Sequence, residues 1–128
     1  MTDPADEIPS LAERARQDKA RFSPPSNPPD EDLALQYLTD GVGDAVGLYI
    51  RARTGEQVRF DTVEFALLER ALNDWFELYA ACYGVDFDAS FTVREVAELV
   101  IETHSIRETA LLLTRIPTRD RRESWAGE

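Results

Sequence analysis

The chain has 128 residues and a formal net charge of −11 at pH 7, because 25 aspartates and glutamates outnumber 14 lysines and arginines. The length suits a single domain with a sizeable core, and the charge disfavours binding to nucleic-acid phosphates and to anionic membranes. No apolar run reaches the length of a membrane span and the first residues do not resemble a signal peptide, so we expect a cytoplasmic protein.

Residues 1–29 predict a flexible arm in front of the folded domain. The Ser10–Glu13 segment has the capping-box pattern and predicts the start of a short helix. The apolar edge of this helix, Leu11 and Ala15, is too thin to hold it in isolation. Four prolines follow within six residues, and such a stretch favours an extended conformation. We therefore expect an acidic arm with a short helix and a proline-rich linker, tethered to a helical domain formed by residues 30–117.

Residues 30–53 predict the first helix of that domain. Asp30 can serve as its N-cap, and Gly55 follows the last apolar residues as a stop signal. Three glycines interrupt the stretch, and each weakens a helix by roughly 1 kcal/mol relative to alanine. The segment is therefore either one long helix or two shorter helices that break near Gly41.

These glycines have two interpretations. Thr39, Gly43 and Gly47 lie four residues apart, which predicts a smooth ridge where another helix packs closely. The same stretch, GVGDAVG, partly resembles a phosphate-binding loop, but its third glycine comes one position late and Asp44 stands where an anion would bind. We predict the packing role.

Residues 61–84 predict the central helix. Asp61 and Glu64 form a capping box, and Gly84 provides the left-handed residue that ends a helix. Apolar residues recur between these ends at steps of three and four, which places them on one helical face. That face consists of Phe65, Leu68, Leu72, Trp75, Tyr79 and Cys82. We therefore expect an all-α fold, a small bundle of three to four helices around the central helix 61–83.

The central helix has more aromatic surface than one neighbouring helix would cover. Core packing accounts for many of these rings, and a contact with another chain is the functional interpretation. The candidate interface consists of Phe65, Trp75, Phe76, Tyr79 and Tyr83. Cys82, the only cysteine, lies on the buried stripe, which indicates an inert thiol and excludes an internal disulfide.

Two short segments flank the central helix. Residues 57–60 and 85–88 alternate apolar and polar side chains, and they predict loops that plug the core or else a minimal two-stranded ribbon. Asp86–Ser90 resembles the start of a calcium loop, but Phe91 replaces the required glycine and Ala97 replaces the required glutamate. We therefore expect no calcium site here.

Residues 92–116 predict one helix or two. Thr92–Glu95 and Ser105–Glu108 both have the capping-box pattern, so the second either restarts a helix or lies inside a longer one. Pro117 stops the helix, and the tail 118–128 is expected to be weakly ordered. The residues expected to face inward from the first part are Val93, Val96, Ala97, Val100 and Ile101.

Residues 107–119 resemble the first helix and turn of a helix-turn-helix DNA-binding protein. They contain Glu-Thr-Ala, a leucine pair and Ile-Pro, followed by basic residues. In that fold the next helix enters the major groove. The resemblance implies DNA contacts by Arg115, Arg119, Arg121 and Arg122, although Thr114 replaces the turn glycine.

No catalytic motif stands out among the numerous carboxylates, and the only histidine, His104, lacks the partners that a metal site needs. We therefore expect a protein that is not an enzyme and that uses neither cofactor nor metal. The predicted function is protein–protein interaction or self-association through the aromatic face of the central helix. The alternatives are a helix-turn-helix DNA-binding regulator, and a small ligand-binding bundle. The pocket of that bundle would be formed by Tyr37, Tyr49, Trp75, Tyr79 and His104.

The acidity has two physical explanations. Lys19 is the only lysine, and an acid-rich, lysine-poor composition is typical of cytosolic proteins from salt-loving archaea, where salt screens self-repulsion. The other explanation is a functional acidic surface. Together with the stretches LTDGVGDAV, LERALNDWFELYA and ELVIETHS, this composition resembles a small uncharacterised haloarchaeal protein family, a domain of unknown function. The resemblance implies no particular activity.

Overall fold

The structure, a computed structural model, describes residues 4–55 and 58–116. Every regular element in this part of the chain is helical. In chain order the elements are α1 (Pro4–Arg21), α2 (Glu31–Gln36), the π-helical segment η1 (Tyr37–Val42), α3 (Gly43–Thr54), α4 (Thr62–Cys82), α5 (Val93–Thr103) and α6 (Ile106–Thr114). The predicted all-α bundle is confirmed, and residues 58–60 and 85–88 are loops.

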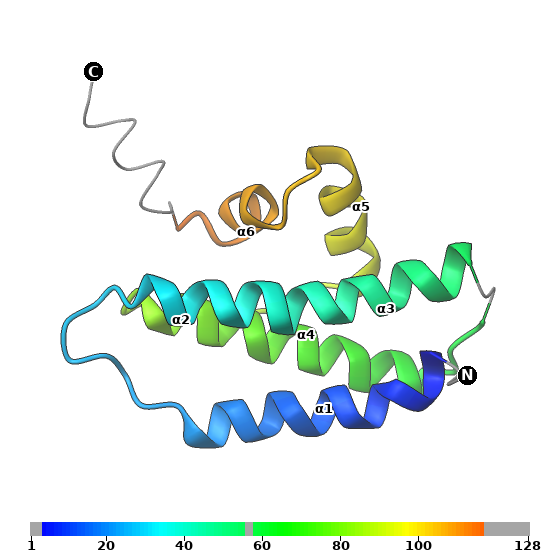
Figure 1. The fold of residues 1–128 in the computed structure, drawn as a ribbon, viewed down its shortest axis with the longest axis horizontal. Helices are drawn as coiled ribbons and strands as arrows, with labels where there is room; N and C mark the ends of the chain where they lie inside the picture. The colour runs from blue at the N-terminus through cyan, green and yellow to red at the C-terminus, as the bar shows by residue number, and fades with distance from the viewer. Residues whose placement is uncertain (1–3, 56–57, 117–128) are drawn as a thin grey trace.

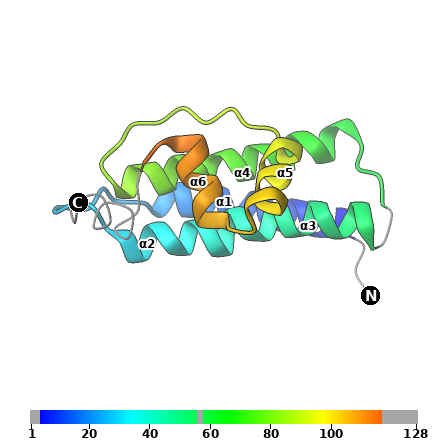
Figure 2. The same cartoon turned by 90° about the horizontal axis from the view of Figure 1, so that it is seen from above.

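Three long rods form the body of the bundle (Figure 1). Helices α1 and α4 run in the same direction, and the rod made of α2, η1 and α3 runs the opposite way. Helices α5 and α6 lie on the side of the bundle away from α1, over α3 and α4 (Figure 2). None of the described helices is long and apolar enough to cross a membrane.

Helix α4 is the centre of the bundle, because it contacts every other element. Its start follows the predicted capping box: Asp61 Oδ1 accepts a hydrogen bond from Glu64 N at 2.8 Å, and Glu64 Oε1 accepts one from Asp61 N at 2.9 Å. Gly84 has a φ angle of 77°, which glycine adopts without steric cost. Of the predicted apolar stripe, only Phe65 is not fully buried.

The chain from Glu31 to Thr54 forms one continuous rod with η1 in its middle. Asp30 caps the rod as predicted, because its Oδ1 accepts a hydrogen bond from Leu33 N at 3.2 Å. The alternative of two separate helices is therefore replaced by a change of helical pitch, since a π-helical turn keeps the rod continuous.

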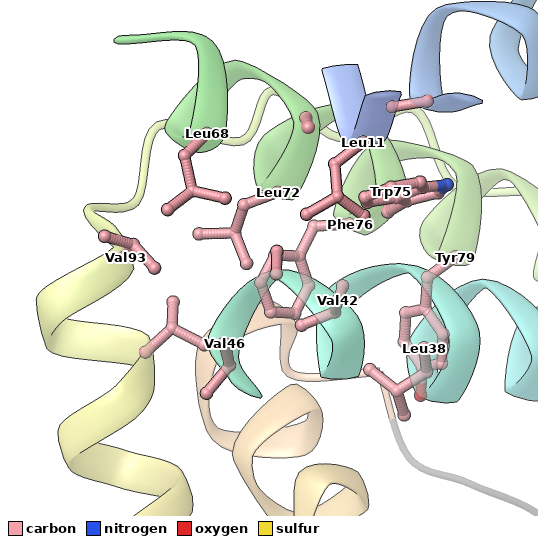
Figure 3. Packing of buried hydrophobic residues seen from close by; sticks show 14 of the residues in the cluster. Leu11, Leu38, Val42, Val46, Leu68, Leu72, Trp75, Phe76, Tyr79 and Val93 are labelled. Atoms are coloured by element: carbon pink, nitrogen blue, oxygen red, sulfur yellow. The ribbon is translucent and has the colours of Figure 1, made fainter. Parts of the chain in front are cut away.

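The close packing of this rod on α4 depends on Gly41. A Cβ atom at Gly41 would lie 2.5 Å from atoms of the Trp75 indole ring, far inside van der Waals contact. The ridge prediction was wrong for Gly43 and Gly47, because a Cβ at Gly43 would meet only a backbone oxygen at 3.5 Å and one at Gly47 would meet nothing within 4 Å. The face that packs on α4 instead contains Leu38, Gly41 and Val42, and Figure 3 shows side chains of this face meeting those of α4.

Helix α1 is part of the bundle, which differs from the flexible arm expected from the sequence. It begins at Pro4, and Ile8, Leu11 and Ala15 are buried in the shared core, mainly against α4. Ser10 therefore lies inside the helix and does not cap it, so the capping box predicted at Ser10–Glu13 was wrong. Three prolines of the linker are exposed, and the linker joins α4 where Asp30 N donates a hydrogen bond to the Cys82 carbonyl at 2.9 Å.

The segment 93–114 forms two helices, which resolves the open alternative. His104 has a φ angle of 56° and ends α5, and Ser105 caps α6 by accepting a hydrogen bond from Glu108 N at 3.1 Å. Val93, Val96 and Ala97 face inward as predicted, but the inward prediction for Ile101 was wrong because its side chain is 57% exposed. Pro117 and the tail 118–128 lie outside the described residues.

Candidate functional site

The aromatic side chains predicted to form an interface lie mainly inside the chain's own core. Trp75 and Phe76 are fully buried and Tyr79 is 1% exposed, while Phe65 and Tyr83 are partly buried. The proposed interface on α4 is therefore corrected. The sequence shows how much apolar surface α4 has, but this surface is covered by α1, by the rod from Glu31 to Thr54 and by α5 and α6.

The predicted ligand pocket is not assembled from the residues that were named for it. Tyr37 and Trp75 line one surface hollow and Tyr49 lines another. His104 is exposed at the break between α5 and α6, and Tyr79 lies in the core. These five residues therefore do not surround a common site.

Only one of the four arginines predicted to contact DNA can be placed. Arg115 is exposed and ends α6 with a φ angle of 61°. Arg119, Arg121 and Arg122 lie outside the described residues, as does the whole recognition helix expected after α6. The DNA-binding alternative therefore stays a prediction.

A cluster of polar groups joins α1 to η1 over the buried Trp75. Trp75 Nε1 donates a hydrogen bond to Asp18 Oδ2 at 2.9 Å, and the Arg14 guanidinium lies 5.0 Å from the indole centroid. Arg14 Nη2 also donates to Asp44 Oδ2 at 2.9 Å and to the Asp40 carbonyl. All of these groups are satisfied by one another, so the cluster serves to hold α1 on the bundle.

The first candidate site is a surface hollow of about 510 Å³ at the C-terminal end of α4, hereafter the acidic-rimmed hollow. Its apolar lining comes from the linker just after α1, from α4 and from the loop after α4. That lining consists of Phe22, Pro24, Leu78, Ala81, Val85 and Phe87. Asp86 and Asp88 stand at its edge, and both are exposed. The hollow therefore combines an apolar floor with a negative rim.

Lysine does not neutralise that rim. Lys19 lines the hollow, but its Nζ pairs with Glu77 Oε1 at 2.6 Å and Asp74 Oδ1 at 3.2 Å. The hydrogen bond to Glu77 raises the pKa of Lys19, so the ammonium stays charged and engaged with these two carboxylates. Among the described residues, none forms an ion pair with Asp86 or Asp88.

The loop that carries this rim is held in place by side chains of α4. Asn73 donates a hydrogen bond to the Phe91 carbonyl at 3.0 Å and accepts one from Phe91 N at 2.9 Å. Glu77 Oε2 accepts a hydrogen bond from Ala89 N at 3.0 Å. The near end of the loop is held as well, because Val85 N donates a hydrogen bond to the Ala80 carbonyl at 3.0 Å. With both ends of the loop bonded to α4, the hollow is formed before a ligand binds.

The second candidate site is a hollow of about 560 Å³ at the opposite end of α4, hereafter the aromatic–arginine hollow. It lies where α3 ends and α4 begins, at the right of the bundle in Figure 1. Its lining consists of Tyr49, Ala52, Arg53, Val58, Arg59, Phe60 and Phe65. Two cations and three aromatic rings thus meet in a chain whose net charge is strongly negative.

The environment of Cys82 can also be compared with its prediction. Cys82 is fully buried, and burial raises the pKa of its thiol to about 12, which agrees with the inert thiol predicted from the sequence. Within residues 4–55 and 58–116, no group of three or more His, Cys, Asp or Glu side chains is arranged to hold a metal ion.

Residues 2–118 match the family model described as Domain of unknown function (DUF8055). The chain belongs to this family. No curated protein and no solved structure matches the chain. The DUF8055 match includes every helix from α1 to α6 and the lining of both hollows, so the expected boundary at residue 30 does not delimit the family domain.

Neither hollow of this DUF8055 chain was predicted from its sequence. The sequence predicts that residues 85–88 plug the core or form a minimal ribbon, but in the structure they are a loop in which Val85 is 38% exposed and only Phe87 packs against the core. The alternation of apolar and acidic residues was the available signal. For the second hollow the only signal was a pair of arginines, Arg53 and Arg59, on either side of a predicted helix end.

Proposed function

We propose that this DUF8055 protein is a protein–protein interaction module that binds a basic, partly apolar peptide segment of another protein in the acidic-rimmed hollow. The observation that carries the proposal is the combination of Val85, exposed beside an apolar floor, with the carboxylates of Asp86 and Asp88, which form no ion pair with any residue that the structure describes. An apolar side chain of the partner fills the hollow, and flanking lysines or arginines face the rim.

The charge of the whole chain supports a basic partner. A net charge of −11 attracts cationic segments and accelerates their encounter with the module. It also disfavours a second copy of the same chain as the partner, because two copies repel each other. The earlier reason for self-association, an uncovered aromatic face on α4, no longer holds because those rings are buried.

Site-specific photo-cross-linking tests the proposal. A photo-reactive amino acid replaces Val85 in the full chain, and a matched control carries it at Val63, which is 68% exposed at the other end of α4. Both proteins are expressed in the source organism and irradiated. We expect the Val85 probe alone to cross-link to a partner segment that contains apolar and basic residues.

Affinity measurements on that segment decide the result. A synthetic peptide of the cross-linked segment should bind the wild type, and Asp86→Asn/Asp88→Asn should weaken it about tenfold through loss of two charged contacts. Asp32→Asn/Glu102→Gln removes the same charge from exposed positions elsewhere and should leave the affinity within about twofold. Equal weakening by both double variants, or a segment without basic residues, would contradict the proposal.

A further inference from the structure

We infer that the aromatic–arginine hollow binds a small aromatic anion, a planar ring that carries a carboxylate or a phosphate group. This ligand class goes beyond the interaction function, and its site lies at the opposite end of α4 from the acidic-rimmed hollow. The inference therefore stands or falls independently of a peptide partner.

The shape of the hollow suits a flat ring. Its volume of about 560 Å³ lies within the range of about 300–1,000 Å³ that is typical of small-molecule sites. Three rings line it in mutually inclined orientations: Phe60 meets Phe65 edge-on with centroids 5.5 Å apart, and Tyr49 is tilted to Phe65 at 6.4 Å. Such inclined rings provide both a face and edges for a further ring, the arrangement that aromatic pairs prefer.

The walls of this hollow are rigid because they belong to the core. Tyr49 is 7% exposed and Phe60 is 9% exposed, so both are held by the packing of α3 and α4. Ala52, which also lines the hollow, is buried, and its single methyl group leaves space beside the rings. The aromatic walls are therefore present before any ligand arrives, which lowers the entropic cost of binding.

Two guanidinium groups provide the charge for an anion. The Arg53 guanidinium lies 5.8 Å from the Tyr49 ring centroid, and Arg53 Nη1 donates a long hydrogen bond of 3.4 Å to the Tyr49 hydroxyl. Neither Arg53 nor Arg59 forms an ion pair with any residue that the structure describes. Because an arginine fork binds carboxylate or phosphate with two parallel hydrogen bonds, these groups have the chemistry to hold an anion.

The nearby carboxylates of α4 do not compete for these arginines. Asp61 and Glu64 are engaged in the capping box at the start of α4, and among the residues that the structure describes no carboxylate lines the hollow. The first turn of α4 also adds a weak positive potential from its aligned backbone dipoles. The chain as a whole carries a net charge of −11, so two arginines without an acidic partner in the described lining give the hollow a charge opposite to that average.

Ligand titration followed by amide chemical shifts tests the inference on the full chain. The probes are benzoate and indole-3-carboxylate as ring carboxylates, and adenosine monophosphate as a ring phosphate. Acetate, inorganic phosphate and benzyl alcohol serve as controls that lack either the ring or the charge. We expect at least one ring-bearing anion to shift the amides of Arg53, Arg59 and Phe65, with an affinity at least tenfold higher than any control compound. Tighter binding of the ring carboxylates identifies the natural ligand as an aromatic carboxylate, and tighter binding of adenosine monophosphate identifies it as a phosphate-bearing nucleotide.

Three single variants separate site binding from general electrostatics. Arg53→Gln and Arg59→Gln should each weaken the best probe about tenfold, because each removes a charge-assisted contact. Arg70→Gln removes the same charge from an exposed position of α4 outside the hollow and should change the affinity by less than twofold. Thermal unfolding by circular dichroism verifies that every variant is folded.

Several results would overturn the inference. These are the absence of shifts at millimolar probe, a control compound that binds as tightly as the ring-bearing anions, or equal weakening by Arg70→Gln. The variant Asp86→Asn/Asp88→Asn should bind the best probe as the wild type does, so failure of the interaction function and failure of this site are distinguishable.

Discussion

Gly41 allows the rod from Glu31 to Thr54 to pack closely on α4, and a methyl group at this position would clash with Trp75. A Cβ atom there would lie 2.5 Å from the Trp75 ring, which is fully buried, so either the ring or the backbone of the rod would have to shift. We therefore expect Gly41→Ala to destabilise the protein by about 1–3 kcal/mol despite the better helix propensity of alanine. Chemical unfolding followed by circular dichroism measures the effect.

Gly47 provides the matched control for that substitution. It lies in the same rod, its surroundings are open, and an added Cβ meets nothing within 4 Å. Gly47→Ala should therefore stabilise the protein by about 0.5–1 kcal/mol. Equal effects of the two substitutions would show that Gly41 does not make the close approach to α4.

Cys82 makes the stability of the fold sensitive to alkaline pH. Burial raises the pKa of the thiol from 9.0 to about 12, so the folded state holds a proton that the unfolded chain loses near pH 9. Stability from a raised pKa is complete below the pKa of the unfolded state and is lost as pH rises toward that of the folded state. We expect the free energy of unfolding to fall by about 1 kcal/mol between pH 8 and 10 through this group.

Comparison with Cys82→Ala isolates this contribution. Burial also raises the pKa of Tyr37 to about 12, so some alkaline destabilisation should remain in the variant. Urea midpoints measured from pH 8 to pH 10 should fall less steeply for Cys82→Ala than for the wild type. Identical pH profiles would mean that the thiol is accessible to hydroxide or ionises in the folded state.

At the scale of the helical element, substitutions in α1 test whether this segment is a packed helix or a tethered arm. Ile8 is fully buried in the core, whereas Ser10, two residues later, is exposed in the interior of the same helix. We expect Ile8→Ala to destabilise the protein by about 2–4 kcal/mol, because it leaves a cavity at the packed face of α1. Thermal or urea unfolding by circular dichroism provides the measurement.

Ser10→Ala is the internal control for this helix. If Ser10 were the N-cap, its loss would cost about 1 kcal/mol. Because it lies inside α1, the substitution should be neutral or slightly stabilising, since alanine is the better helix former. If Ile8→Ala is neutral and Ser10→Ala is destabilising, the packed helix is contradicted and the interpretation as a flexible arm with a short capped helix is supported.

The comparison of capping boxes explains what can be read from sequence at this scale. Asp61–Glu64 and Thr92–Glu95 start helices as predicted, and Ser105–Glu108 restarts one. Ser10–Glu13 has the same pattern but lies inside α1, because the residues before it are also helical and bury Pro4 and Ile8 against the bundle. A local pattern predicts a cap correctly only when the upstream residues have no tertiary contacts that extend the helix.

At the scale of the whole molecule, the apolar periodicity of residues 61–82 was sufficient to predict the bundle and its central helix. It could not predict which elements cover α4, because periodicity shows that one face of a helix is buried but does not show which other elements pack on that face. The two hollows depend on residues that are distant in sequence, such as Phe22 beside Val85 and Tyr49 beside Phe60. The hollows form only when the helices pack together, so no local sequence motif predicts them.

The net charge of −11 acts on the folded chain as a whole. Folding brings carboxylates closer together than they are in the unfolded chain, so self-repulsion opposes the compact state. Potassium chloride shortens the Debye length from about 10 Å at 0.1 M to about 3 Å at 1 M, which screens this repulsion. We expect the midpoint of thermal unfolding to rise by about 5 °C over that range.

A variant with fewer charges separates screening from other effects of salt. Asp86→Asn, Asp88→Asn and Glu102→Gln together remove three exposed negative charges that take part in no ion pair of the described chain. If repulsion is the cause, this triple variant unfolds at a higher temperature than the wild type at 0.1 M salt, and the difference shrinks at 1 M. A difference that does not depend on salt would instead assign the effect to local contacts of Asp86, Asp88 and Glu102, and would contradict self-repulsion as the cause.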